Sequence, residues 1–201
     1  MRIFLDVGAY NGNTAAAVLQ DTLKFDKIYC FEPIPAFCKA IREMKSDKIV
    51  VCEFGLWKET STKNIYEAHS PGASIFIDKF RNPIVETQVK MVKASDWFAE
   101  NIKDTDEVYL KLNCEGAECD ILSDLMDSGQ YKKISVLMVD FDARKIPSQK
   151  HKEWEIREKF KTHPIPVIIT VENSDRRKWP KDQAAWVHHW LGKAREDIKK
   201  I

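Results

Sequence analysis

The sequence predicts an α/β domain in which a mostly parallel, twisted sheet carries helices on both faces. Short apolar runs alternate with helical patterns over most of the 201 residues. A turn with two glycines follows the first apolar run, and several later runs end near acidic residues. This alternation is typical of βαβ units, whose parallel strands end at one common edge of the sheet.

The first quarter of the chain predicts two strand–helix units and a third strand. Ile3-Phe4-Leu5 has the character of a buried strand that ends at Asp6. Strands are expected at residues 3–5, 27–31 and 49–52, and helices at residues 14–23 and 37–44.

The middle of the chain is less regular. Between about residues 60 and 92, Pro71, Gly72 and Pro83 separate strand-like pieces at residues 74–77 and 88–92. We expect an antiparallel excursion or a loop that lies over the sheet.

Regular alternation resumes in the second half. Helices are expected at residues 95–101, 117–126, 149–160 and 182–199, and strands at residues 108–112, 134–141 and 166–171.

The last expected helix has an apolar stripe at helical spacing, formed by Val187, Leu191, Ala194 and Ile198. Trp186 and Trp190 share this helix, and we expect them to pack in the core. Trp179 precedes the helix. His188 and His189 point about 100° apart on a helix, so they do not form a joint ligand pair.

Composition and charge exclude several classes of protein. Hydrophobic residues make up 44% and charged residues 31%, which is typical of soluble globular proteins. The formal charge of +1 gives no reason to expect a nucleic-acid partner. No apolar run approaches the roughly 20 residues of a membrane span, and Asp6 interrupts the only early apolar stretch.

The cysteines indicate the compartment. There are five of them, an odd number without a CxxC pair, which argues against a disulfide framework and against a zinc site. We therefore expect reduced thiols and a cytoplasmic protein. The first strand begins almost at residue 1, so residues 1–201 are expected to form a single domain, either a minimal protein or a part of a longer polypeptide.

The most informative segment follows the first strand and runs from Asp6 to Thr14. Gly8 and Gly12 allow a sharp turn and a close approach of the backbone to a ligand. Their spacing differs from the GxGxxG of dinucleotide-binding loops, and the GK[ST] of a Walker A loop is absent. Glu32 ends the second strand, where a carboxylate would accept hydrogen bonds from both hydroxyls of a ribose. Together, the loop and Glu32 favour a nucleoside ligand.

Three blocks of this sequence resemble the FkbM-type methyltransferase family. They are Phe4-Leu5-Asp6-Val7-Gly8-Ala9, Phe31-Glu32-Pro33 and Leu110-Lys111-Leu112-Asn113-Cys114-Glu115-Gly116-Ala117-Glu118. The third block is the most specific, and the resemblance ends near residue 142. It implies a Rossmann-like class I fold and dependence on S-adenosylmethionine, with S-adenosylhomocysteine as the product. It also implies methylation of hydroxyls, often on sugars or polyketide-like acceptors.

The resemblance assigns the cofactor-binding residues. Asp6, Gly8, Gly12, Asn13 and Thr14 would surround the methionine end. Tyr10, Asn11 and Asn113 are further candidates for contact with the cofactor. Glu32 would hold the ribose with Pro33 beside it, and Phe54, Gly55 and Leu56 would lie near the adenine. Asn113 stands where the family usually has Asp, and a neutral amide cannot act as a base.

Methyl transfer to a hydroxyl requires an aligned acceptor and a base. Asp140 and Asp142 follow the fifth predicted strand, at the carboxyl edge where open α/β sheets bind ligands. Asp142 is the first candidate for the base and Asp140 its rival, with Glu115 or His69 next. No metal is expected, because Asp140 and Asp142 would point to opposite faces of an extended segment.

His69, Ser74 and Glu118 are the candidates for contact with the acceptor. His69 and Ser74 belong to the irregular middle, where a loop could cover the acceptor. Glu118 is equally well explained by charge complementation at a helix N-terminus.

The function expected from these observations is O-methylation of a hydroxyl, most of all on a sugar in a glycan. The preference for a sugar as the acceptor is implied by the family resemblance only. One alternative is a methyltransferase for another small molecule or an amine. The other is a cofactor-binding module whose acceptor site has decayed, which Asn113 favours and the glycine loop and Glu32 oppose.

Overall fold

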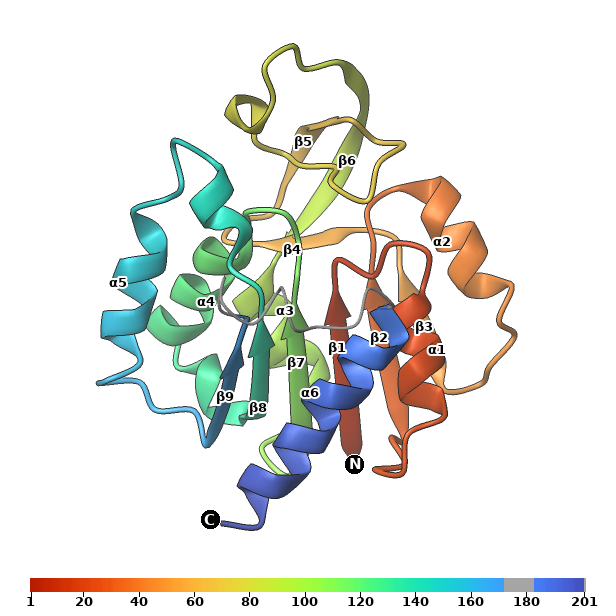
Figure 1. The fold of residues 1–201 in the computed structure, drawn as a ribbon, viewed down its shortest axis with the longest axis vertical. Coiled ribbons are helices and arrows are strands. Elements are labelled where there is room, and N and C mark those ends of the chain that lie inside the picture. Colours follow the sequence, from red (N-terminus) through yellow and green to blue (C-terminus); the bar gives the residue numbers. More distant parts are fainter. Residues whose placement is uncertain (172–182, 201) are drawn as a thin grey trace.

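Six strands form one parallel sheet in the order β3-β2-β1-β7-β8-β9 (Figure 1). The computed structural model describes residues 1–171 and 183–200. The strands are β1 (Arg2–Val7), β2 (Lys27–Phe31), β3 (Ile49–Cys52), β7 (Glu107–Leu112), β8 (Ile134–Val139) and β9 (Val167–Thr170). The strand order reverses between β1 and β7, which makes the carboxyl ends of these two strands the expected place for a ligand.

Helices cover both faces of the sheet, as predicted (Figure 1). The alternation along β1 shows why: Phe4 packs in one hydrophobic cluster, and Leu5 packs in the other. The first cluster also contains residues of α1 (Asn13–Leu19), α2 (Pro35–Arg42) and α6 (Gln183–Ile198). The second contains residues of α3 (Ala94–Asn101), α4 (Glu118–Asp127) and α5 (Lys152–Lys159).

A second, smaller sheet lies beyond the carboxyl ends of the main strands (Figure 1). It contains β4 (Gly55–Trp57), β6 (Val85–Lys93) and β5 (Ser61–Tyr66) in that order. β5 and β6 are antiparallel, which confirms the predicted excursion. The segment between them, residues 67–84, carries the short helix η1 (Ile77–Lys79) and is called the cap below.

The strand expected at residues 74–77 is wrong. Only Ser74 forms a β-bridge, to Tyr66, and η1 begins at Ile77. The Ser74 hydroxyl donates to the carbonyl of Glu115 and accepts the N–H of Phe76. These side-chain bonds replace the backbone ladder that a strand would need.

Several element boundaries also differ from the expected ones. The first helix ends at Leu19 rather than at residue 23, because Asp21 accepts the N–H of Leu23 and forms a turn. The strand expected at residues 134–141 ends at Val139. Two short helices, η2 (Gln130–Lys133) and η3 (Asp142–Lys145), precede and follow this strand.

The last helix packs as its stripe predicted. Val187, Leu191 and Ala194 are fully buried, and Trp190 is buried with them. Trp186 packs against the same cluster, and His188 and His189 are exposed. Trp179 lies outside the residues that the structure describes.

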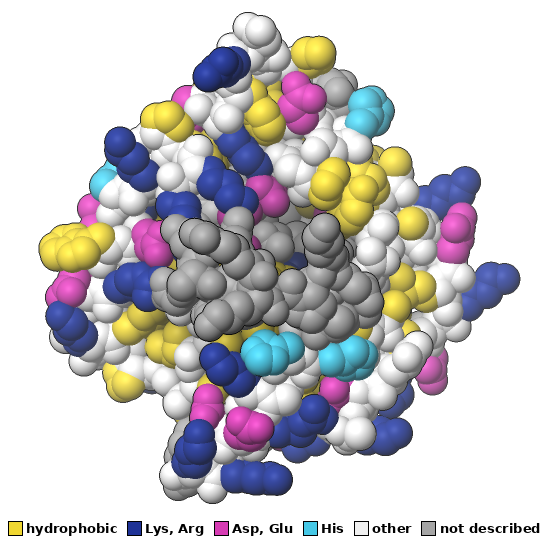
Figure 2. Space-filling view, viewed as in Figure 1, with side chains coloured by type: hydrophobic (Ala, Val, Ile, Leu, Met, Phe, Trp, Pro, Cys, Tyr) yellow, Lys and Arg dark blue, Asp and Glu magenta, His cyan; other side chains and the backbone are white. Residues whose placement is uncertain are grey.

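All five cysteines are free thiols. Within residues 1–171 and 183–200, no helix has the length and apolar character that a membrane crossing requires. Figure 2 shows Lys and Arg side chains interspersed with Asp and Glu, in keeping with 32 basic and 31 acidic residues.

Candidate active site

A cavity lies at the carboxyl ends of β1, β2 and β7, with residues of the cap in its wall. The empty space in it, the open mouth included, is about 640 Å³. Aromatic and aliphatic side chains form most of the wall, among them Phe31, Phe37, Leu56, Ile65 and Met91. The polar groups of the wall include those of Glu32, Ser70, Ser74, Asn113 and Glu115. An apolar cavity with few polar groups suits an organic ligand that is held at specific points.

Gly8 brings the loop after β1 close to the end of β7. Its φ is +77°, and a Cβ at this position would lie 2.1 Å from the carbonyl oxygen of Asn113. The N–H groups of Gly8 and Ala9 both donate to the carbonyl of Phe31 at 3.1 Å. The loop is therefore tied to β2 on one side and packed against β7 on the other, with no room for a side chain at residue 8.

A buried ion pair between Asp6 and Lys111 contacts this loop. Asp6 and Lys111 are register partners on β1 and β7, and their side chains are 0% and 1% exposed. The Lys111 ammonium donates to Asp6 Oδ1 at 2.7 Å and to the carbonyl of Gly8 at 2.9 Å. A buried lysine needs such partners, because an uncompensated charge inside a protein costs several kcal/mol. Lys111 thereby fixes the position of Gly8.

Glu32 follows β2 and is 5% exposed. Its Oε2 accepts the N–H of Tyr10 at 2.8 Å, and its Oε1 accepts the N–H of Ile34 at 2.9 Å. Burial raises the pKa of Glu32 to about 7, against the lowering effect of these two N–H groups. Each carboxylate oxygen keeps a second lone pair, so Glu32 can accept hydrogen bonds from two ligand hydroxyls.

Asn113 offers a further acceptor next to Gly8. Its Oδ1 is buried and has no hydrogen-bond partner among the described residues, although Asn113 is part of the cavity wall. A buried amide oxygen without a partner is unfavourable. A donor group on a bound ligand would satisfy it.

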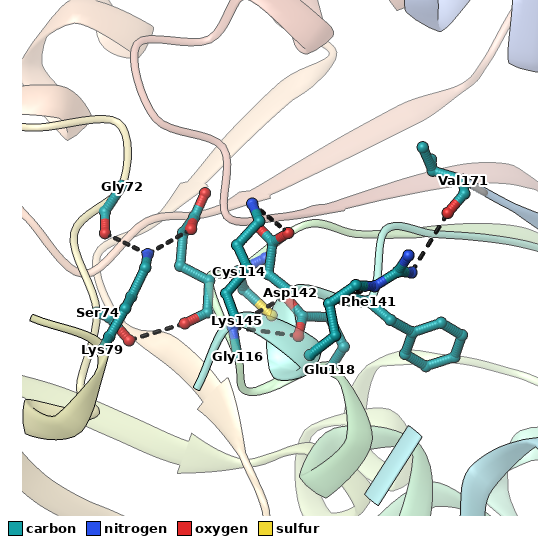
Figure 3. Close-up of polar contacts among 12 residues, drawn as sticks. Gly72, Ser74, Lys79, Cys114, Gly116, Glu118, Phe141, Asp142, Lys145 and Val171 are labelled. Atoms are coloured by element: carbon teal, nitrogen blue, oxygen red, sulfur yellow. Dashed lines mark hydrogen bonds and ion pairs between the residues drawn. The ribbon is translucent and has the colours of Figure 1, made fainter. Parts of the chain in front are cut away.

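Glu115 lies where the chain passes from β7 into α4. Its φ is +57°, its carbonyl accepts the hydroxyl of Ser74 at 2.7 Å, and its Oε2 accepts the ammonium of Lys79 at 2.5 Å. Lys79 also donates to the carbonyl of Gly72 (Figure 3). Burial raises the pKa of Glu115 and repulsion from Asp142 adds to this, while Lys79 opposes both. A carboxylate with a raised pKa in a cavity wall is suited to accept a proton.

Glu118 and Asp142 are two further carboxylates close to this turn, and both are buried. Glu118 accepts the N–H groups of Cys114 and Gly116, which shapes the turn before α4. Burial, with repulsion from Asp142, raises the pKa of Glu118 to about 7. Asp142 pairs with Lys145 at 2.5 Å. Neither carboxylate is part of the cavity wall.

The structure brings some of the predicted residues together and not others. Those in the cavity wall are Gly8, Tyr10, Glu32, Pro33, Gly55, Leu56, Ser74, Asn113 and Glu115. Those outside it are Asp6, Asn11, Gly12, Asn13, Thr14, Phe54, His69, Glu118, Asp140 and Asp142. Gly12 instead faces Met44 and Ile41, because α1 begins directly after it.

Asp140 and Asp142 were expected to point to opposite faces of one extended segment. This is wrong, because Asp142 begins the short helix η3. Among the described residues, no group of three His, Cys, Asp or Glu side chains has a geometry that could hold a metal ion.

Two lysines that contact residues of the cavity wall, Lys111 and Lys79, were not predicted from the sequence. Lys111 could have been found from the sequence, because a charged residue inside the apolar strand Glu107–Leu112 needs a buried partner. Nothing in the sequence indicates the contact of Lys79, since it lies 36 positions from Glu115 in the irregular middle of the chain.

Comparison with protein families agrees with this geometry. Residues 6–175 match the model of the methyltransferase FkbM domain. The chain belongs to the FkbM methyltransferase family. The match confirms the resemblance seen in the three sequence blocks and extends past residue 142 into the last third of the chain.

A crystal structure of methyltransferase FkbM from Methylobacillus flagellatus KT is similar to part of the chain, with 18% identity and a TM-score of 0.44. The match covers 67% of this chain and 32% of that one, so this chain spans about a third of the other's length. A search of curated proteins gives no match.

Proposed function

We propose that this member of the FkbM family is an S-adenosylmethionine-dependent O-methyltransferase that acts on a hydroxyl group, most of all on a sugar in a glycan. The observation that carries the proposal is that two carboxylates, Glu32 and Glu115, belong to the wall of one cavity at the carboxyl edge of the sheet. Glu32 is suited to bind a ribose, and Glu115 is suited to accept a proton.

The residues of the cavity fit the cofactor. Glu32 has free lone pairs for ribose hydroxyls, Asn113 Oδ1 lacks a partner among the described residues, and Gly8 leaves no side chain between the loop and β7. The apolar wall near Phe37 and Leu56 suits a purine. S-adenosylmethionine would supply an electrophilic methyl group on a positively charged sulfur.

The protein's own task is then to align the acceptor and take its proton. Glu115 is the favoured base, because it belongs to the cavity wall and Asp142, the first candidate from the sequence, does not. The ionised Glu115 would accept the hydroxyl proton as the acceptor oxygen is methylated. Ser70 belongs to the same wall and is the candidate for contact with an acceptor, because the Ser74 hydroxyl is already bonded to Glu115 and Phe76.

A decayed cofactor-binding module is the second candidate. Asn113, in place of the family's usual Asp, is the observation that favours it.

Five unpaired cysteines support a reducing compartment such as the cytoplasm. The single domain over residues 1–201 stays a prediction.

Transfer of a labelled methyl group from S-adenosylmethionine to a panel of glycosides and amines tests the function. We expect labelling of a glycoside oxygen. Glu115→Gln should lower kcat by about 10²–10⁴-fold, the usual share of general base catalysis, with little change in cofactor affinity. Asp142→Asn is the companion variant and should lower kcat less. Cofactor binding without transfer to any acceptor would favour the decayed module instead.

A further inference from the structure

Lys79 is the one residue of η1 that reaches the candidate base. Its side chain is 10% exposed, and its ammonium donates to Glu115 Oε2 and to the carbonyl of Gly72, both at 2.5 Å. Gly72 belongs to the turn in which Ser70 Oγ accepts the N–H of Gly72. Ser70 and Pro71 of this turn are part of the cavity wall, as is Glu115. The ammonium of Lys79 thus contacts both the cap turn at Gly72 (Figure 3) and the carboxylate of Glu115 between β7 and α4.

We propose that Lys79 is a positioning residue that holds Glu115 ionised and aimed into the cavity. The inference rests on the proposed function, since the base matters only if a proton is transferred. With the cap in place, the ammonium of Lys79 stabilises the carboxylate form.

The surroundings of Glu115 make the effect of Lys79 large. Asp142 of η3 is a buried acidic neighbour, and its charge disfavours a negative charge on Glu115. Lys145 of η3 is a second cation, but it pairs with Asp142 at 2.5 Å. Lys79 is therefore the cation in direct contact with Glu115 among the described residues.

Asp78 provides a matched control from the same short helix. It accepts the N–H and the hydroxyl of Ser148 at 2.7 and 3.1 Å, which fastens the cap to the loop before α5. These contacts do not involve Glu115. A change at Asp78 loosens the cap and leaves the charge beside the carboxylate in place.

Carbon-13 NMR of glutamate-labelled protein measures the titration of Glu115 directly, with Glu115→Gln to assign its carboxyl signal. We expect Lys79→Met to raise the pKa of Glu115 by about one unit or more, the usual effect of losing an adjacent cation. Lys79→Gln should do the same, Lys79→Arg should restore the wild-type value, and Asp78→Asn should leave it unchanged. With an active acceptor, the acid limb of the pH profile of kcat/KM should move by the same amount.

An unchanged Glu115 pKa in both Lys79→Met and Lys79→Gln would overturn the proposal, as would an equal shift in Asp78→Asn. The NMR readout needs neither cofactor nor acceptor. Failure of the wild-type protein to bind S-adenosylhomocysteine would refute the proposed function and leave the Lys79 result standing.

Discussion

At the scale of a single residue, Gly8 sets how closely the first loop approaches β7. Two separate constraints act on this position: a positive φ, which L residues adopt at a cost, and the carbonyl oxygen of Asn113 at 2.1 Å from a Cβ. Gly129 has nearly the same φ, +78°, but nothing lies within 4 Å of a Cβ there. Comparison of the two glycines separates the backbone cost from the cost of crowding.

Gly129→Ala should lower the free energy of unfolding by about 1–2 kcal/mol, the cost of a left-handed conformation. Gly8→Ala should cost about 1–3 kcal/mol more, because the obstacle is backbone that cannot turn aside. Urea unfolding of both variants measures the difference. Equal costs would mean that the loop does not pack against β7 as described.

At the scale of elements, the Asp6–Lys111 pair joins the two central strands of the sheet. Both side chains are buried, so each charge depends on the other. Lys111 also donates to the carbonyl of Gly8, which connects the pair to the cavity loop.

Lys111→Met should lower the free energy of unfolding by about 3–5 kcal/mol, because it leaves the Asp6 carboxylate buried without its cation. The double variant Asp6→Leu/Lys111→Met should cost less than the single one, since no uncompensated charge remains. Urea unfolding at pH 7 checks both values. A double variant that is less stable than Lys111→Met would contradict this account.

The elements also show what the sequence predicts well. β2 and β3 have the predicted bounds, because uninterrupted apolar runs are flanked by polar residues. The cap was predicted as irregular with a strand at residues 74–77. That strand is absent, because the shape of the cap depends on contacts such as Ser74 with Glu115 across 41 positions. The contact of Lys79 with Glu115 was not predicted for the same reason, since 36 positions separate the two residues. The Asp6–Lys111 pair is intermediate: both residues stand in recognisable blocks, but their pairing follows only from the register of β1 and β7.

At the scale of the whole molecule, buried carboxylates make stability depend on pH. Burial raises the pKa values of Glu32 and Glu118 from 4.5 to about 7. Between these values the folded state binds more protons than the unfolded state, so the free energy of unfolding falls as pH rises. The loss between pH 4.5 and 7 is roughly 3 kcal/mol for each group.

Glu118→Gln removes one of these titrations and keeps a hydrogen-bond acceptor at the turn before α4. We expect the fall in unfolding free energy from pH 4.5 to 7 to be smaller in this variant by roughly 3 kcal/mol. Urea unfolding across this range measures it. Parallel curves for the two proteins would show that Glu118 has an ordinary pKa.

The site as a whole was predicted in part. Residues that stand at the ends of strands, such as Glu32 and Glu115, meet in one wall because parallel strands share an edge. Asp142 does not join them, because the chain turns into η3 directly after β8 and buries this side chain. The end of a strand can be predicted from its apolar run, whereas the direction of the side chains in the following turn depends on contacts that the run does not encode.

Isothermal titration calorimetry with S-adenosylhomocysteine and with NAD⁺ tests the central claim most directly. We predict that the wild-type protein binds S-adenosylhomocysteine and does not bind NAD⁺. Glu32→Ala should weaken binding by about 1.5–3 kcal/mol, the usual loss for a hydrogen bond to a charged group. Glu53→Ala, at a half-exposed carboxylate paired with Arg42 beyond β3, should bind as the wild type does. Binding of NAD⁺ without binding of S-adenosylhomocysteine would contradict the account.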